Sequence, residues 1–257
     1  MVVSERALSF GSAADAYERH RLGYPDAVAD LTLAYSEPPV ARVVEVGAGT
    51  GKSTRLFAGR GLAVTAVEPD PGMAAVLRRT TEGLAVEVVL ATLESYAPPA
   101  QPYDLLLSAS AWHWTDPAQR WDRTAALLRP GGTVALFGSA WAGSRLVDPA
   151  LQEALAALRR EVIADETRLT EHQGPSGTWW PGSELVEDPR FADVEEHDVR
   201  RVVRRHRAEH LAVLATVSAY LVLPPAEREA LLGRIGAVLP EEVEVDATVR
   251  LHLARRV

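Results

Sequence analysis

An alternation of strand-like and helix-like segments over residues 43–137 constrains the fold of this chain more than any other feature. Short β-branched or apolar runs predict strands at residues 43–46, 63–67, 86–90, 103–108 and 133–137. Helix-compatible stretches separate them at residues 52–60, 71–79 and 117–128. Strands that alternate with helices in this way run parallel, because each helix carries the chain back across the sheet. The alternation therefore predicts a doubly wound, Rossmann-like α/β sheet.

The segments on either side predict additions to this sheet. Residues 12–35 are helical in pattern, with an interruption at Gly23, Tyr24 and Pro25, where the proline restricts the residue before it. Residues 243–253 alternate apolar and polar side chains, which predicts a strand with one polar face that runs antiparallel to its neighbour. We expect a seven-stranded sheet, mostly parallel with the last strand antiparallel, together with a helical N-terminal cap and a lid insertion.

We expect a single domain of residues 1–257 built from four parts. They are an N-terminal helical cap (1–38), a ligand-binding core (40–138), a lid or insertion (143–190) and a C-terminal completion of the sheet (191–257). Apolar residues at helical spacing predict an amphipathic helix at 151–162 inside the lid. The rest of the lid is rich in Gly, Pro and Ser around Trp179 and Trp180.

Composition excludes several classes of function. The formal net charge of −8 argues against a duplex-binding surface, which gains affinity by releasing counterions from phosphates. With no cysteine, the chain has no disulfide, thiolate zinc site, cysteine nucleophile or iron–sulfur cluster. His206 and His210 have the H-x-x-E-H spacing without a third ligand motif, so we expect no metal. No signal peptide or long apolar run is evident, and we expect a soluble cytoplasmic protein without a membrane partner.

Three glycines between the first strand and the next helix indicate a ligand-binding loop. Gly47, Gly49 and Gly51 stand where a backbone can approach a ligand at a helix N-terminus. A phosphate-binding Walker A loop is one alternative, since Gly51 precedes Lys52 and Ser53, but the loop is one residue short. A dinucleotide loop is a second alternative, in which the third glycine comes one position early.

A third alternative is a resemblance to a known family. The run Glu-Val-Gly-Ala-Gly-Thr-Gly at residues 45–51, with Glu68 at the end of the second strand, resembles the cofactor motifs of class I S-adenosylmethionine-dependent methyltransferases. A carboxylate at that strand end can accept both ribose hydroxyl hydrogens. Residues 91–94, 103–116 and 127–132 also resemble family motifs, and residues 10–25 are similar to an N-terminal cap. The resemblance covers residues 10–239 and is greatest for the small-molecule subgroup that includes trans-aconitate-type and ubiquinone-biosynthesis-type enzymes.

This resemblance implies a site for S-adenosylmethionine, with S-adenosylhomocysteine as product. The glycine loop would pass beside the methionine part, Glu68 beside the ribose, and Glu45 would hold the ammonium group directly or through water. The implied cofactor residues are Tyr17, Arg21, Glu45, Gly47, Ala48, Gly49, Gly51, Glu68, Pro69, Met73, Leu93, Glu94, Ser108 and Ala109.

Methyl transfer needs alignment and exclusion of water more than catalytic side chains. His113 is a candidate base for a hydroxyl group, or else a structural residue that packs the turn beside Trp114. We expect Trp112, Trp179 and Trp180 on the substrate side, in a partly aromatic pocket with one cation. The expected function is methylation of a small molecule, with oxygen ranked before carbon and nitrogen as the acceptor atom. The alternatives are a protein that binds S-adenosylmethionine without transferring methyl, and a P-loop-like NTPase.

Overall fold

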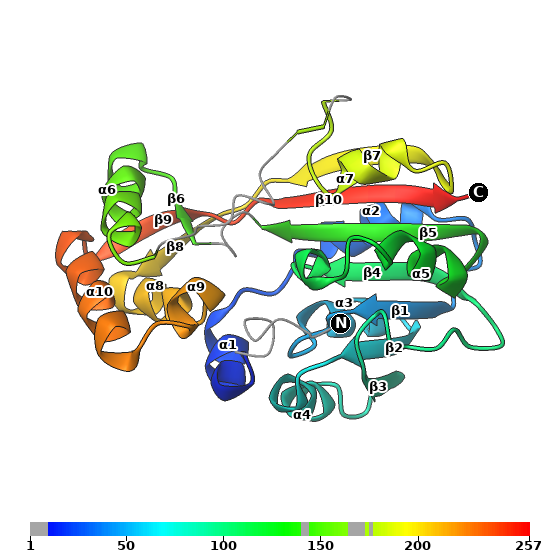
Figure 1. Cartoon of the computed structure of the whole chain (residues 1–257), viewed down its shortest axis with the longest axis horizontal. Helices are drawn as coiled ribbons and strands as arrows, with labels where there is room; N and C mark the ends of the chain where they lie inside the picture. The colour runs from blue at the N-terminus through cyan, green and yellow to red at the C-terminus, as the bar shows by residue number, and fades with distance from the viewer. Residues whose placement is uncertain (1–9, 140–143, 164–172, 175–176) are drawn as a thin grey trace.

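The computed structural model describes residues 10–139, 144–163, 173–174 and 177–257. At its centre is a seven-stranded sheet in the order β3-β2-β1-β4-β5-β10-β7 (Figure 1). Its strands are β1 Arg42–Val46, β2 Ala63–Glu68, β3 Val86–Leu90, β4 Tyr103–Ala109, β5 Leu128–Ser139, β7 Phe191–Val199 and β10 Val249–Arg256. Strands β1 to β5 pair in parallel, whereas β10 is antiparallel to both β5 and β7. The predicted sheet, mostly parallel with an antiparallel last strand, is confirmed.

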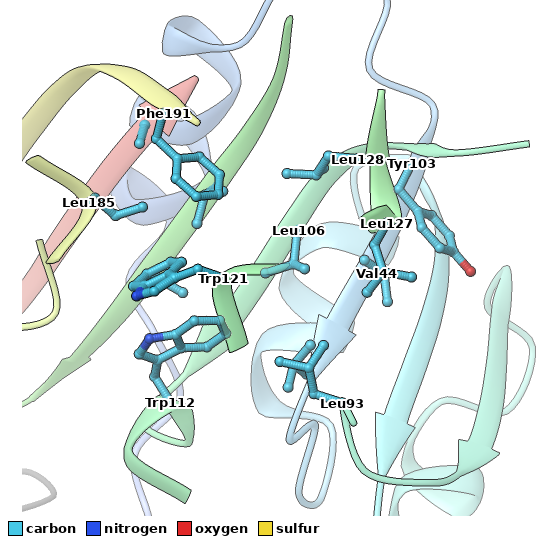
Figure 2. Close-up of a cluster of buried hydrophobic side chains, with 14 of the residues drawn as sticks. Val44, Leu93, Tyr103, Leu106, Trp112, Trp121, Leu127, Leu128, Leu185 and Phe191 are labelled. Atoms are coloured by element: carbon cyan, nitrogen blue, oxygen red, sulfur yellow. The ribbon is translucent and has the colours of Figure 1, made fainter. Parts of the chain in front are cut away.

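Helices cover both faces of this sheet. The helices around it are η1 Gly11–Ala13, α1 Ala14–His20, α2 Asp26–Tyr35, α3 Lys52–Ala58, α4 Pro71–Thr80, η2 Trp112–Trp114, α5 Arg120–Leu127 and α7 Gly182–Glu187. Leu105 and Leu107 of β4 are buried with side chains of α2 and α3. Leu106, between them in sequence, is buried on the other face with side chains of α5 and α7, where Trp112 and Trp121 lie one above the other (Figure 2). The strand therefore buries both faces, as a doubly wound sheet requires.

A second, smaller unit lies beyond the carboxyl ends of β4 and β5 (Figure 1). It contains a three-stranded sheet in the order β6-β9-β8 and four helices with their own apolar core. We call it the small lobe. Its elements are β6 Arg145–Leu146, α6 Pro149–Arg160, β8 Val202–His206, α8 Arg207–Leu214, α9 Ser218–Leu221, α10 Pro225–Val238 and β9 Glu242–Asp246. Local patterns did not predict this unit.

The prediction of one continuous strand at 243–253 was wrong. The chain leaves the small sheet after Asp246 and enters the main sheet at Val249. Between them Ala247 donates its N–H to the Arg201 carbonyl at 2.8 Å, and Asp246 accepts from the Thr248 N–H at 3.0 Å. The alternation of apolar and polar residues continues through the junction, so the pattern does not indicate that the chain passes from one sheet to the other. The polar face predicted for this strand is also wrong for β10, where His252 is buried.

Residues 129–132, part of the motif at 127–132, lie inside β5, although the sequence predicted a strand only from residue 133. The register with β4 shifts there, from Tyr103 opposite Leu128 to Leu105 opposite Thr133, so these residues form a bulge. Asp104 accepts a hydrogen bond from Arg129 at 2.8 Å within the bulge.

The predicted lid segment, residues 143–190, contributes to both the small lobe and the main sheet. The amphipathic helix predicted at 151–162 corresponds to α6, which buries Leu155 in the small lobe. Helix α7, in the part expected to be a loop, packs on β7 and β10 of the main sheet. Residues 143, 164–172 and 175–176 of this segment lie outside the described residues. No helix in the described residues is long and apolar enough to cross a membrane.

Candidate active site

The glycine loop connects β1 to α3 in a backbone conformation that suits glycine. Gly47, Gly49 and Gly51 have φ angles of +69°, +58° and +88°. A Cβ on Gly47 would lie 2.4 Å from the Ala111 Cβ, so the loop packs closely against the end of β4. A Cβ on Gly49 would meet no atom within 4 Å, so open space lies beside this residue. The loop therefore borders room for a ligand at the point where the strand order reverses.

Glu68 lies next to this loop, as the sequence predicted. Its carboxylate accepts the Gly49 N–H at 2.8 Å and the Asp70 N–H at 2.9 Å. Burial raises the pKa of Glu68 to about 7. The two backbone hydrogen bonds favour the charged form and lower the pKa, but they do not outweigh burial. Each carboxylate oxygen has a second lone pair, so the group can still accept hydroxyl hydrogens.

Glu45 lies under the loop and is fully buried. Its two carboxylate oxygens accept the hydroxyl groups of Ser53 and Thr54 in the first turn of α3. Burial raises the pKa of Glu45 to about 7. Because this carboxylate has no exposed surface and bonds the first turn of α3, a direct contact with an ammonium group does not fit its position. The contact through water stays a prediction.

The cap residues Tyr17 and Arg21 come together at the end of α1. The Arg21 guanidinium lies 5.1 Å from the centre of the Tyr17 ring. It also donates to Thr216, from Nε to Oγ1 at 2.8 Å and from Nη2 to the carbonyl oxygen at 3.1 Å. Arg21 therefore ties the cap to the small lobe.

The other implied cofactor residues are largely buried. Met73 packs with Ala14 and Val76 between α1 and α4. Leu93 lies in the core beside the sheet, Ala48 packs against Leu77, and Pro69 and Ala109 are half-buried. Glu94 accepts the Asp116 N–H at 2.7 Å, and Ser108 donates its hydroxyl to the Val46 carbonyl at 2.9 Å.

A cavity of about 560 Å³ lies between the carboxyl edge of the sheet, the cap and the small lobe. Its wall includes seven of the predicted site residues, namely Tyr17, Arg21, Ser108, Trp112, His113, Trp179 and Trp180. The structure thus brings the cap, the end of β4 and the lid tryptophans to one space. Its volume is typical of sites that enclose small organic ligands.

The three tryptophans differ in how they contribute. Trp112 and Trp180 are also core residues, 3% and 9% exposed, and the Trp180 indole N–H donates to Glu184 at 2.9 Å. Trp179 is half-buried, with the Arg250 guanidinium 4.7 Å from its ring centre. His113 is exposed in η2, with its ring centre 4.5 Å from that of Trp114, and it lines the cavity. It therefore faces the cavity and not the core.

The expectation of one cation in the pocket was wrong. Four arginines and two aspartates line the cavity: Arg21, Arg145, Arg159, Arg250, Asp198 and Asp246. Asp198 is paired with Arg250 at 2.8 Å, which leaves an excess of positive charge on the wall. Sequence reasoning missed Arg145 in β6 and Arg159 in α6 because no local pattern distinguishes them from the other arginines. It also missed Ser110, whose φ of +57° at the end of β4 no local pattern indicates.

The glycine loop after β1, the acid at the end of β2 and the cavity at the carboxyl edge lie where ligands bind in doubly wound α/β sheets. Residues 43–132 match the model of a family described as methyltransferase domain. The chain is also similar to a putative type II methyltransferase from Anaeromyxobacter dehalogenans, with a TM-score of 0.63 and 21% identity over 91% of this chain and 97% of that one. Residues 43–132 are therefore a methyltransferase domain, and the whole chain has the fold of that solved methyltransferase.

Its curated relatives include an uncharacterized methyltransferase of Mycobacterium tuberculosis, 44% identical over 133 residues, 51% of this chain and 52% of that one. A malonyl-[acyl-carrier protein] O-methyltransferase of Pseudescherichia vulneris is 28% identical over 82% of each chain. An rRNA adenine N-6-methyltransferase of Corynebacterium diphtheriae is 30% identical over 65% of this chain and 56% of that one. The chain thus spans about half the length of the first of these relatives.

Proposed function

We propose that this chain transfers the methyl group of S-adenosylmethionine to a small-molecule acceptor. The observation that carries the proposal is the cavity of about 560 Å³, whose wall includes Ser108 and Trp112 beside the glycine loop. A reactive methyl group held at the loop would face this cavity, and the acceptor would approach from the other side. The cap and the small lobe would limit the access of water.

For the cofactor, the open space beside Gly49 and the Glu68 carboxylate fit a nucleoside with a ribose diol. When bound, S-adenosylmethionine supplies an electrophilic methyl group on a sulfonium. We assign the methionine part to the loop from Gly47 to Gly51 and the ribose to Glu68, with Pro69, Met73, Leu93 and Glu94 toward the adenine. Tyr17 and Arg21 would close over the methyl group, beside Ser108 and Ala109.

For the acceptor, we rank oxygen before carbon and nitrogen. The aromatic and arginine side chains of the wall favour a ring-bearing molecule with an anionic group. The name of the malonyl-carrier relative also specifies an oxygen acceptor. Although another relative is named for rRNA, a cavity of about 560 Å³ and a net charge of −8 favour a small molecule over a nucleic acid.

The test combines binding with turnover. Calorimetry should detect S-adenosylhomocysteine binding to the wild type, and incubation of the enzyme with S-adenosylmethionine and aromatic acids should release S-adenosylhomocysteine. Binding without release for any acceptor would favour the non-transferring alternative. A rise in melting temperature with ATP, and none with S-adenosylmethionine, would favour the NTPase alternative.

A further inference from the structure

The cavity wall contains a histidine that the sequence analysis did not assign. His252 lies in β10, opposite Leu136 of β5 on one side and Glu196 of β7 on the other. It lines the cavity, yet only 2% of its surface is exposed. An imidazole in this position is held firmly by the sheet and still borders the space proposed for the acceptor.

The orientation of the ring follows from its contact with α7. A Cβ on Gly182 would lie 2.4 Å from Nδ1 and 3.1 Å from Cε1 of His252, so this edge of the ring is covered by the start of α7. Nδ1 is buried and has no hydrogen-bond partner among the described residues. The Nε2–Cδ2 edge is the part of the ring left to face the cavity.

A carboxylate lies beside the covered edge. Oε2 of Glu196 is 3.5 Å from Nδ1 of His252, and it accepts the backbone N–H of Trp179 at 2.9 Å. Trp179 itself lines the cavity. A carboxylate held in this way favours the tautomer with the proton on Nδ1, which leaves the lone pair of Nε2 toward the cavity.

The imidazole is uncharged at neutral pH. Burial, with a further contribution from Arg250, lowers the pKa of His252 to about 4, and Asp198 opposes this shift. Among the described residues, the charged groups near the ring are therefore Glu196 and Asp198 on β7 and Arg250 on β10. A neutral imidazole can accept a proton, whereas an imidazolium cannot.

We propose that His252, positioned by Glu196, accepts the proton that the substrate loses during methyl transfer. In this role His252 selects an aromatic acid that carries a hydroxyl group. This inference rests on the proposed function. In the step, the acceptor oxygen forms a bond to the sulfonium methyl carbon, and the carbon–sulfur bond breaks with its electron pair remaining on sulfur. The O–H bond breaks at the same time, and its proton moves to Nε2 of His252 and then to solvent.

The proposal specifies a hydroxyl acceptor because a carboxylate has no proton to lose at neutral pH and needs no base. The arginines of the small lobe, Arg145 and Arg159, line the same cavity and would attract the carboxylate of the acceptor. The predicted product is a methyl ether with a free carboxylate.

The first test measures the tautomer and charge of His252 without turnover. Nitrogen-15 spectra of the histidine-labelled protein, assigned by comparison with His252→Gln, should show a neutral ring protonated on Nδ1 from about pH 5 to pH 8. Glu196→Gln should shift the ring toward the Nε2-protonated tautomer. An Nε2-protonated ring in the wild type, or a ring that carries a positive charge at pH 8, would overturn the proposal.

The second test uses a matched pair of probes, hydroxynaphthoate and naphthoate, with the S-adenosylhomocysteine-loaded enzyme. Hydroxynaphthoate should shift the Nε2 resonance of His252, and naphthoate should leave it unchanged. If hydroxynaphthoate fails to bind, or binds without shifting that resonance, the assignment of His252 to the acceptor site is wrong.

The third test is turnover with the same probes. His252→Gln should lower kcat for ether formation about 100-fold at neutral pH. The matched control is His197→Gln on β7, because His197 pairs with Glu195 and does not line the cavity, and it should keep wild-type activity. Formation of a methyl ester would overturn the inference and leave the proposed methyltransferase function intact. If S-adenosylmethionine fails to bind at all, the proposed function itself fails, whatever the tautomer of His252.

Discussion

At the scale of single residues, Gly49 combines a left-handed backbone conformation with open space for a ligand beside it. We predict that Gly49→Val abolishes S-adenosylhomocysteine binding, because the branched side chain would fill the open space beside the loop. The left-handed φ of +58° adds strain of roughly 1–2 kcal/mol. Gly61→Val is a matched control, since Gly61 has a φ of +82°, meets open space and lies outside the loop. Calorimetry on both variants should show lost binding only for Gly49→Val.

Glu68 should make cofactor binding depend on pH. Because burial raises its pKa to about 7, Glu68 is protonated below neutral pH in the protein without ligand. It must lose this proton before its carboxylate can accept hydrogen bonds from both ribose hydroxyl groups. Affinity for S-adenosylhomocysteine should therefore rise as the pH increases from about 6 to 8, by at most tenfold per unit. In Glu68→Gln, calorimetry should show affinity weaker by about 1.5–3 kcal/mol at pH 8 and a flatter pH profile. An unchanged affinity in the folded variant would remove the ribose assignment.

At the scale of elements, a hydrogen bond between the end of α1 and the turn after α8 links the cap to the small lobe. The bond from Arg21 Nε to Thr216 Oγ1, 2.8 Å long, is buried and joins residues 195 positions apart. We predict a coupling free energy of about 1.5–3 kcal/mol between Arg21→Met and Thr216→Val in a double-mutant cycle of denaturant unfolding. Additive effects of the two substitutions would show that this bond does not stabilise the packing of the cap against the small lobe.

The five parallel strands of the main sheet and the helices between them could be predicted because each carries its own local signal. The β-branched run before Gly47 and the proline and capping aspartate at the start of α4 are readable from a few neighbouring residues. The small lobe could not be predicted in this way. Strand β6 has two residues, and the alternation of β9 continues into β10 without interruption at Ala247. Only pairing with distant strands separates these elements.

At the scale of the whole molecule, buried histidines should make stability depend on pH. His210 in α8 is fully buried, and burial lowers its pKa to about 4. Below about pH 6.5 the unfolded chain binds a proton that the folded chain excludes, so this group lowers the free energy of unfolding as the pH falls. The change in the free energy of unfolding caused by His210→Phe, measured by urea unfolding, should therefore be about 2 kcal/mol more favourable at pH 5 than at pH 8. An equal difference at both pH values would show that folding does not lower the pKa of His210.

The sequence by itself determined the five parallel strands, the ligand loop and the acid beside it, because these features depend on residues that are near one another in the chain. It also indicated that Tyr17, Arg21 and the tryptophans belong to one site. Only the tertiary structure decided the composition of the cavity wall. Arg21, Arg159 and His252 come from the cap, the small lobe and β10, and they share one cavity because those parts pack together. The charge state of His252 was decided in the same way, since burial by neighbours distant in sequence lowers its pKa.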